Sequence, residues 1–295
     1  MRITLLGTGT PAPSRTRQSS GYLLEIGDDV IVIDHGPGAA HRLLEAGRTP
    51  KDVTHLFLSH LHYDHIADYP RLVLQRWDSG VGTVAALPIY GPAPLARVHE
   101  RFFGDDGAYE PDIRSRVSHR ASLDVFAARG GTGTRTPPAH TLREIAAGDV
   151  VEGRDWRLTV GRAQHFEPYL TCLAFRFDMA EGSIVYSGDN GGVTDDMIRL
   201  ARGCDILIHM CHFATGDEPS EAFRAAAGSH LDVAKTAAEA GAKTLVLTHL
   251  TPLMDRPGFL ERLVGEMAQI YGGEIIIGRD LLRLSPSAPR VAGID

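Results

Sequence analysis

One short segment concentrates side chains that bind metals. Ser59-His-Leu-His-Tyr-Asp-His65 carries three imidazoles and a carboxylate directly after an apolar run typical of a buried strand. In extended chain His60 and His62 point to the same side, and a turn at Asp64 and His65 directs those two side chains to a neighbouring point. Paired metals lie about 3.5–4 Å apart. The motif therefore predicts parts of two adjacent metal sites.

Two metals need more ligands than this motif offers. His165, Asp189 and His249 each follow a later run typical of a strand, and ligands gather where buried strands end. Taken singly, each could instead be an ordinary core or loop residue. Imidazole and carboxylate ligands suit zinc, and manganese or iron are compatible with the same ligand types.

The elements around these residues alternate in the manner of an α/β protein. Helices are expected where Ser229 can cap a run that Gly241 closes, and from Phe259 to Ile270. The strands expected from short apolar runs are Arg2–Gly7, Gly21–Glu25, Val30–Asp34, His55–Ser59, Arg157–Arg162, Thr171–Phe177, Ser183–Ser187, Asp205–His209 and Thr244–Thr248.

The segment from about residue 104 to 153 differs from the rest of the chain. It holds Gly130-Gly131, Pro137-Pro138 and few periodic apolar positions, so it is expected to be an inserted loop region or arm. Either it covers a site or it is a surface excursion without a function.

Composition limits the compartment and the partners. Thirty basic and thirty-seven acidic residues give a net charge of −7, with no polybasic run to attract phosphate backbones. Three cysteines are few, and their number is odd, so a disulfide framework is not expected. This favours a reducing compartment and a cytoplasmic location. No apolar stretch is long enough to span a bilayer, so no membrane association is expected.

Several motifs, in order, resemble the metallo-β-lactamase superfamily. They are the His60–His65 cluster, the later His165, Asp189 in Tyr-Ser-Gly-Asp, and His249 in Leu-Thr-His-Leu. Further matches resemble the branch that contains the tRNA 3′-processing endonuclease ribonuclease Z: Leu5-Leu-Gly-Thr-Gly-Thr-Pro11, Ile33-Asp-His-Gly36, Ile89-Tyr-Gly-Pro92, Ile208-His209 and Ser229-His230.

The resemblance implies one αββα sandwich domain over residues 1–295, with two Zn²⁺ at one edge. By the family pattern, one metal would be bound by His60, His62 and His165, the other by Asp64, His65 and His249, and Asp189 would bridge them. A bridging water whose pKa is lowered toward about 7 would supply hydroxide for hydrolysis. Asp64 is also expected to take part in catalysis.

The remaining polar residues receive weaker assignments. The resemblance directs His230 toward the metals as a proton donor, although it could be an incidental residue of the first helical turn. The other candidates, for positioning ligands or lining the pocket, are Asp34, His35, Tyr63, His209, Cys211 and His212.

Two departures from the family bear on the substrate. Only 24 positions separate His165 from Asp189, which leaves no room for the family's tRNA-gripping arm, and Met210 replaces the glutamate of the Ile-His-Glu motif. These departures favour a hydrolase of a small ester, lactone, amide, cyclic amide or phosphodiester, with nucleic acid disfavoured as a partner. A homodimer is compatible with the resemblance.

Two alternatives stay open. The first is a ribonuclease Z-like endonuclease or other phosphodiesterase that grips its substrate with Arg114, Arg116 and Arg120 of the insert. The second is a metal-binding scaffold without catalytic activity.

Overall fold

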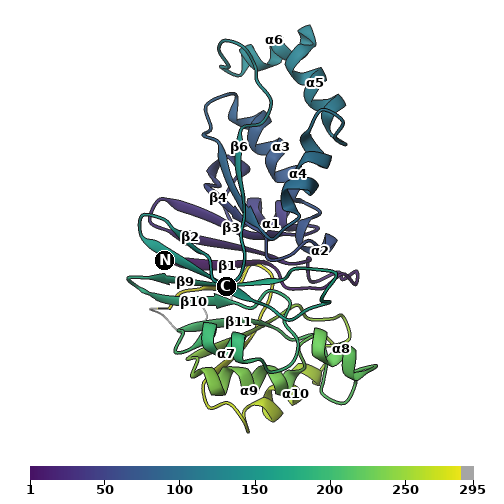
Figure 1. Cartoon of the computed structure of the whole chain (residues 1–295), viewed down its shortest axis with the longest axis vertical. Coiled ribbons are helices and arrows are strands. Elements are labelled where there is room, and N and C mark those ends of the chain that lie inside the picture. Colours follow the sequence, from purple (N-terminus) through teal and green to yellow (C-terminus); the bar gives the residue numbers. More distant parts are fainter. Residues whose placement is uncertain (287–295) are drawn as a thin grey trace.

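The structure is a computed structural model that describes residues 1–286. Two seven-stranded sheets stack against each other, and helices cover both outer faces (Figure 1). This arrangement is the predicted αββα sandwich. No helix within the described residues has the length and apolar character needed to cross a bilayer.

The first sheet has the strand order β14-β1-β2-β3-β4-β5-β6. It pairs antiparallel from β14 to β3 and parallel from β3 to β6. Its strands are β1 (Arg2–Gly7), β2 (Gly21–Ile26), β3 (Asp29–His35), β4 (His55–Phe57), β5 (Leu87–Gly91), β6 (His140–Glu144) and β14 (Arg283–Leu284).

The second sheet has the order β13-β12-β11-β10-β9-β8-β7. Its parallel part runs from β10 to β13, and its antiparallel part from β7 to β10. The strands are β7 (Val150–Glu152), β8 (Trp156–Arg162), β9 (Leu173–Met179), β10 (Gly182–Tyr186), β11 (Ile206–Met210), β12 (Thr244–Thr248) and β13 (Glu274–Ile277).

The helices divide between the two halves of the chain. Those of the N-terminal half are α1 (Ala39–Glu45), the 3-10 helix η1 (Pro50–Asp52), α2 (Tyr63–Ile66), α3 (Tyr69–Gly80), α4 (Leu95–Phe103), α5 (Glu110–Ser118) and α6 (Arg120–Ala128). Those of the C-terminal half are α7 (Asp195–Ala201), α8 (Glu221–Ala226), α9 (His230–Ala240) and α10 (Phe259–Met267).

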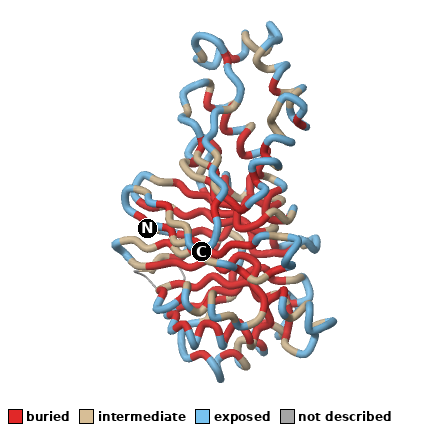
Figure 2. The backbone as a smooth tube through the Cα atoms, viewed as in Figure 1, coloured by how far each residue is buried: buried red, intermediate tan, exposed pale blue. Residues whose placement is uncertain are grey.

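Burial is concentrated in three apolar layers. One lies between the sheets and contains Phe57, Trp156 and Phe175; the others lie between each sheet and its helices. Figure 2 shows the two sheets as the most continuously buried part of the chain. The parallel strands β11 and β12 are fully buried, as expected for strands with helices on one face and a second sheet on the other.

Most expected strands are present with small changes in their ends, and the helix at 230–240 has the predicted cap, because the Ser229 side chain accepts from the amide of Asp232. Two expected elements are shorter. The strand at His55 ends at Phe57, since the amide of Ser59 donates to the Asp34 carboxylate instead of a neighbouring strand. The last helix ends at Met267, where tighter turns replace the helical bonds.

The inserted segment at 104–153 is largely regular structure. It contains α5, α6, β6 and β7, and Figure 1 shows α5 and α6 projecting away from the sandwich beyond α3 and α4. We call the projection formed by α3 to α6 and residues 129–139 the arm. The short helices of this segment were not expected because they have few periodic apolar residues; α5 buries only Ile113 and α6 only Phe126.

Candidate metal centre

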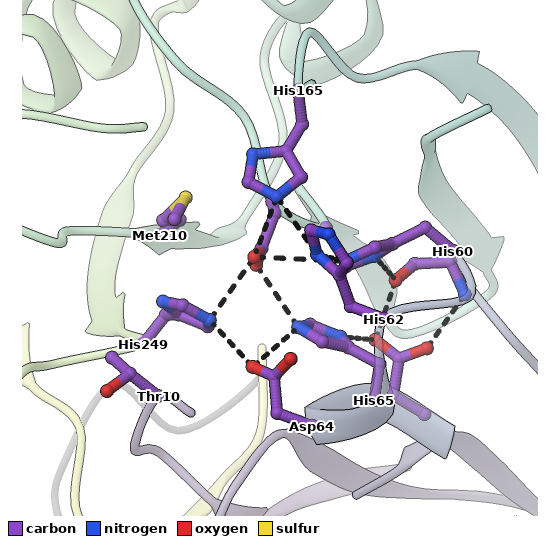
Figure 3. Close-up of polar contacts among 12 residues, drawn as sticks. Thr10, His60, His62, Asp64, His65, His165, Met210 and His249 are labelled. Carbon is purple, nitrogen blue, oxygen red and sulfur yellow. Dashed lines mark hydrogen bonds and ion pairs between the residues drawn. The ribbon is translucent and has the colours of Figure 1, made fainter. Parts of the chain in front are cut away.

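Seven ionisable side chains from distant parts of the chain converge at one end of the two sheets. They fall into the two predicted sets, each with ligand atoms within 4.8 Å of one another: His60, His62, His165 and Asp189 in one, and Asp64, His65 and His249 in the other. Figure 3 shows the five imidazole rings directed toward a common centre. The folding of the chain thus brings together all of the residues expected to be ligands.

Strand ends and one short helix place these side chains. His60 follows β4, His62 is the N-cap of α2, and Asp64 and His65 lie within α2. The chain approaches closely below this helix: a Cβ on Gly36 would lie 1.8 Å from the carbonyl oxygen of Asp64, so only glycine fits there.

The other three ligands come from the second sheet, after β8, β10 and β12. His249 has a φ of 56°, in the left-handed region that is strained for a residue other than glycine. Asp34, at the end of β3, has a similar φ of 53°. Such strain is common at functional sites, where the surrounding fold enforces it.

Hydrogen bonds fix which ring nitrogen of three histidines faces the centre. The Nδ1 of His165 lies 2.5 Å from the carbonyl oxygen of Ala226, and the Nδ1 of His65 lies 2.8 Å from Asp34 Oδ2. The Nδ1 of His60 lies 3.0 Å from Ser59 Oγ, whose own proton goes to Asp34. Because each Nδ1 is engaged by an oxygen atom, Nε2 is the ring nitrogen that faces the cluster.

Asp34 is the hub of this supporting network. Its carboxylate accepts from the amide and hydroxyl of Ser59 at 2.7 Å each, from His65 Nδ1 at 2.8 Å and from the Tyr186 hydroxyl at 2.8 Å. Because Tyr186 belongs to the second sheet, Asp34 also connects the two sheets. The structure therefore places Asp34 where it was expected, behind the ligand histidines.

Asp189 lies between the two sets. Its Oδ2 is 3.2 Å from His249 Nε2 and 3.6 Å from His165 Nε2, while its Oδ1 is 3.4 Å from His65 Nε2. Burial alone would raise the pKa of Asp189, but the charges of His249 and His65 outweigh it and hold that pKa well below its usual value. The carboxylate is therefore ionised at neutral pH.

The donor set suits divalent cations. The Nε2 of His60 and that of His165 lie 3.1 and 3.2 Å from His62 Nδ1, so three ring nitrogens meet at one point. Burial and the charge of His65 lower the pKa of His60 far below normal, which leaves its nitrogen unprotonated. The buried Nε2 of His65 has no hydrogen-bond partner. Converging lone pairs and ionised carboxylates are what a divalent cation satisfies.

Two of the expected accessory histidines, His212 and His230, lie differently with respect to the cluster. His212 contacts it, with its Nδ1 3.1 Å from His249 Nδ1. His230 is buried with both nitrogens engaged elsewhere: Nδ1 accepts from the Thr215 amide at 3.0 Å, and Nε2 lies 2.8 Å from Glu266 of α10. The carboxylate that His230 contacts thus belongs to α10.

The remaining candidates lie apart from the cluster or at its edge. His209 and Cys211 are buried; the Nδ1 of His209 bonds the carbonyl of Met210, and burial raises the pKa of the Cys211 thiol to about 12. His35 is buried with neither ring nitrogen hydrogen-bonded. Tyr63 is 59% exposed, and its hydroxyl donates to the carbonyl of Pro11.

Sequence reasoning missed several residues of the site. Ser59 and Tyr186 stand within the quoted motifs, directly beside a ligand or near one, so their positions carried a usable signal. Glu266 and Phe166 carried none. Phe166 follows His165, has a φ of 37°, and its ring centre is 5.6 Å from that of His62 while 47% of the residue is exposed.

Comparison with known proteins agrees with this geometry. The model of the β-lactamase superfamily domain matches residues 30–250. Ribonuclease Z of Mycobacterium bovis (strain BCG / Pasteur 1173P2) is 30% identical over 290 residues, covering 96% of this chain and 98% of the relative. Ribonuclease Z of Mycolicibacterium gilvum (strain PYR-GCK) is 32% identical over 291 residues and covers 96% of each chain.

Two solved structures share the fold. The metallo-β-lactamase fold protein YhfI from Bacillus subtilis has a TM-score of 0.70 at 22% identity, covering 96% of this chain and 99% of its own. Human tRNase Z, short form, has a TM-score of 0.68 at 19% identity, covering 97% and 99%.

The fold and the ligand arrangement define a metal-dependent hydrolase. The chain belongs to the metallo-β-lactamase superfamily and is a ribonuclease Z-like member of it. The expectation that nucleic acid is disfavoured as a partner is wrong, because the full-length relatives are ribonucleases. That expectation gave too much weight to the net charge, which is a property of the whole surface, and to the absence of one segment, which is a property of one loop. Neither describes the reacting centre.

Proposed function

We propose that this protein is a metal-dependent phosphodiesterase that cleaves RNA, with tRNA precursors as the substrate class. The observation that carries the proposal is the convergence of all seven ligand residues in a chain whose ribonuclease Z relatives match it from end to end. The reading as a hydrolase of small molecules has no comparable support in these relatives.

The residues present fit two divalent cations. His60, His62 and His165 would hold one, Asp64, His65 and His249 the other, and Asp189 stands between them. The nitrogen and oxygen donors suit zinc. Such cations supply Lewis-acid polarisation of a phosphoryl oxygen and make a water acidic at neutral pH.

The chain's own groups perform the other tasks. Asp64 accepts a hydrogen bond from His249 at 3.3 Å and stays ionised, since the contributions of His249 and His65 outweigh burial and lower its pKa. It is thereby held as an acceptor at the reacting centre, able to orient an attacking water. Asp34 keeps the ligand rings of His60 and His65 aligned through its bonds to Ser59 and His65.

An exposed aromatic pair lies beside the ligands. Tyr63 and Phe166, which we call the aromatic rim, are 59% and 47% exposed, and Phe166 lies against the ring of His62. Exposed rings next to a phosphodiesterase centre suit stacking of unpaired bases, the usual way in which single-stranded RNA is recognised.

The proposed proton donor is His230. Its Nε2 lies 2.8 Å from the Glu266 carboxylate, so this pair resembles a general acid with its tuning carboxylate. To donate a proton to a leaving oxygen, the His230 ring must break its contact with Glu266 and contact the substrate instead. Glu266 is partly exposed, so its side chain has room to move away.

The test is incubation of the zinc-loaded protein with an end-labelled tRNA precursor bearing a 3′ extension. Matched reactions use a panel of small esters, lactams and phosphodiesters. Cleavage at one position near the 3′ end is expected, together with weak turnover of the small compounds. The Asp189→Asn variant should lose cleavage by at least about a hundredfold because it removes the charge between the two ligand sets.

Efficient turnover of one small ester or lactam without any RNA cleavage would contradict the proposal. A protein that binds metal but acts on neither class would instead favour the scaffold alternative. Asp52→Asn, in the 3-10 helix η1 and outside both ligand sets, serves as the matched carboxylate control.

A further inference from the structure

A second site lies in the arm, away from the metal centre. A cavity of about 210 Å³ opens between α3, α6 and residues 132–139. Two arginines line it, Arg76 and Arg135, both more than nine-tenths buried. Neither residue belongs to the ligand sets or to the network around Asp34.

Arg76 is a buried cation without a carboxylate partner. Its Nε donates to the carbonyl of Val53 at 3.0 Å and its NH1 to that of Ala85 at 2.7 Å. No ion pair joins it to an acidic residue among residues 1–286. Burial without an offsetting carboxylate lowers its pKa. Since a guanidinium has five N–H donors, three remain for a ligand.

The neighbouring arginines add positive charge. Asp78 accepts from Arg116 at 2.9 Å, from Arg129 at 3.1 Å and from Arg135 at 2.5 Å. Apart from Asp78, only Asp112 pairs with this group, through Arg116. With Arg76 included, four guanidinium groups are balanced by two carboxylates, so the base of the arm attracts anions.

Of the three arginines first expected to grip RNA, Arg116 belongs to this group, whereas Arg114 and Arg120 do not. Arg114 pairs with Glu110 at 3.1 Å and Arg120 with Asp124 at 2.9 Å, each one helical turn away. Their charges are locally neutralised and exposed, so they form no comparable anion site. The surplus charge lies at the cavity, which Arg76 and Arg135 line, and a guanidinium forms strong charge-assisted hydrogen bonds with an anion.

The cavity walls favour an anion that carries an organic group. Thr132 and Thr134 also line the cavity, while Val73, Leu87 and Phe126 supply an apolar side. The guanidinium of Arg135 stacks on the Trp77 ring, 4.6 Å from the ring centre, and this contact holds the guanidinium in place. We propose that this cavity binds a small organic phosphate monoester, with the phosphate on Arg76 and the organic group against the apolar wall.

The experiment is calorimetric titration of the zinc-loaded protein with AMP, with inorganic phosphate and with adenosine. AMP should bind at least tenfold more tightly than adenosine and more tightly than phosphate. Arg76→Met should weaken AMP binding at least tenfold, whereas Arg114→Met, which removes a compensated arginine, should leave it unchanged.

Because Arg76 also bonds two carbonyls, a second variant avoids disturbing the fold. Thr132 is exposed at the cavity, so Thr132→Trp should block entry and abolish AMP binding, while Thr141→Trp, an exposed threonine outside the cavity, should not. Three results would overturn the proposal: equal affinity for AMP and adenosine, binding of phosphate but not of AMP, and unchanged AMP binding in both Arg76→Met and Thr132→Trp. The third result would place any bound AMP at the metal centre. None of these outcomes depends on RNA cleavage.

Discussion

At the scale of single residues, Asp34 determines whether the ligand histidines are aligned. Its Oδ2 accepts three hydrogen bonds, from Ser59, His65 and Tyr186. In Asp34→Asn an amide nitrogen at that position cannot accept. We expect a loss of stability of about 3 kcal/mol, because buried donors lose their acceptor. Metal affinity should fall about 10–100-fold, the usual effect of removing a partner of a ligand histidine.

Urea unfolding and zinc titration against a fluorescent chelator measure the two effects. Asp52→Asn is the control, since Asp52 bonds only within its own turn around Thr49. Unchanged zinc affinity in a folded Asp34→Asn protein would show that Asp34 has no role in ligand alignment.

Glu266 is the second residue whose effect can be isolated. If His230 is the proton donor, Glu266→Gln removes the negative charge that stabilises its protonated form while keeping a hydrogen-bond acceptor near Nε2. We expect cleavage to fall about tenfold with zinc content unchanged, and the alkaline side of the pH–rate profile to change shape, because a proton donor loses its proton as pH rises. The comparison variant is Glu261→Gln, on the same helix. A rate equal to wild type would remove Glu266 from the mechanism.

At the scale of elements, the loop after β8 and the helix α2 form the aromatic rim. Phe166→Ala should weaken binding of a single-stranded 3′ extension by about 1–3 kcal/mol, the usual contribution of one base stacked on an aromatic ring. Filter binding of RNA with and without the extension measures it. Leu44→Ala removes an equally exposed apolar side chain from α1 and should have no effect. If Phe166→Ala weakened the binding of RNA without the extension by the same amount, this result would argue against stacking.

The arm depends on the ion pairs of Asp78. Burial alone would raise the pKa of Asp78, but the bond from Arg135 and the charge of Arg116 outweigh it and lower that pKa. The stabilisation is therefore present above the ordinary carboxyl pKa of about 4 and disappears as pH falls through the lowered value.

Asp78→Asn should accordingly cost about 1 kcal/mol at pH 7 and much less at pH 3, a small value because the carboxylate is partly exposed. Urea unfolding at both pH values checks this. Asp124→Asn, which removes an exposed pair within α6, should change stability little at either pH. If Asp78→Asn lowered the free energy of unfolding equally at pH 7 and pH 3, Asp78 would not stabilise the arm by ionic attraction.

At the scale of the whole molecule, the metal centre connects the two sheets. His60 to His65 follow β4 of the first sheet, whereas Asp189 and His249 follow β10 and β12 of the second. A cation shared by these ligands stabilises only the assembled sandwich. Zinc at a hundred times its dissociation constant should add about 2.7 kcal/mol to the free energy of unfolding. Calorimetry with zinc, and after chelation, tests this expectation, and an unchanged melting temperature would contradict it.

The ligands and most of the sandwich could be predicted from the sequence because their signals are local. Histidines packed around Asp64 after an apolar strand are rare, and β1 and the cap at Ser229 follow from short-range preferences. Strands β5 and β13 were missed, being short runs next to proline or glycine whose pairing partners lie far along the chain.

Spacing and residue type by themselves predicted the seven candidate ligands, the α/β class and the chemistry that such donors favour. Only the tertiary structure decided that Glu266 meets His230, that Phe166 lies against His62, and that Arg76 is buried without a carboxylate partner among residues 1–286. The physical reason is that ligand type and strand periodicity are properties of neighbouring residues, whereas burial and charge balance arise when helices and strands from separate parts of the chain pack together.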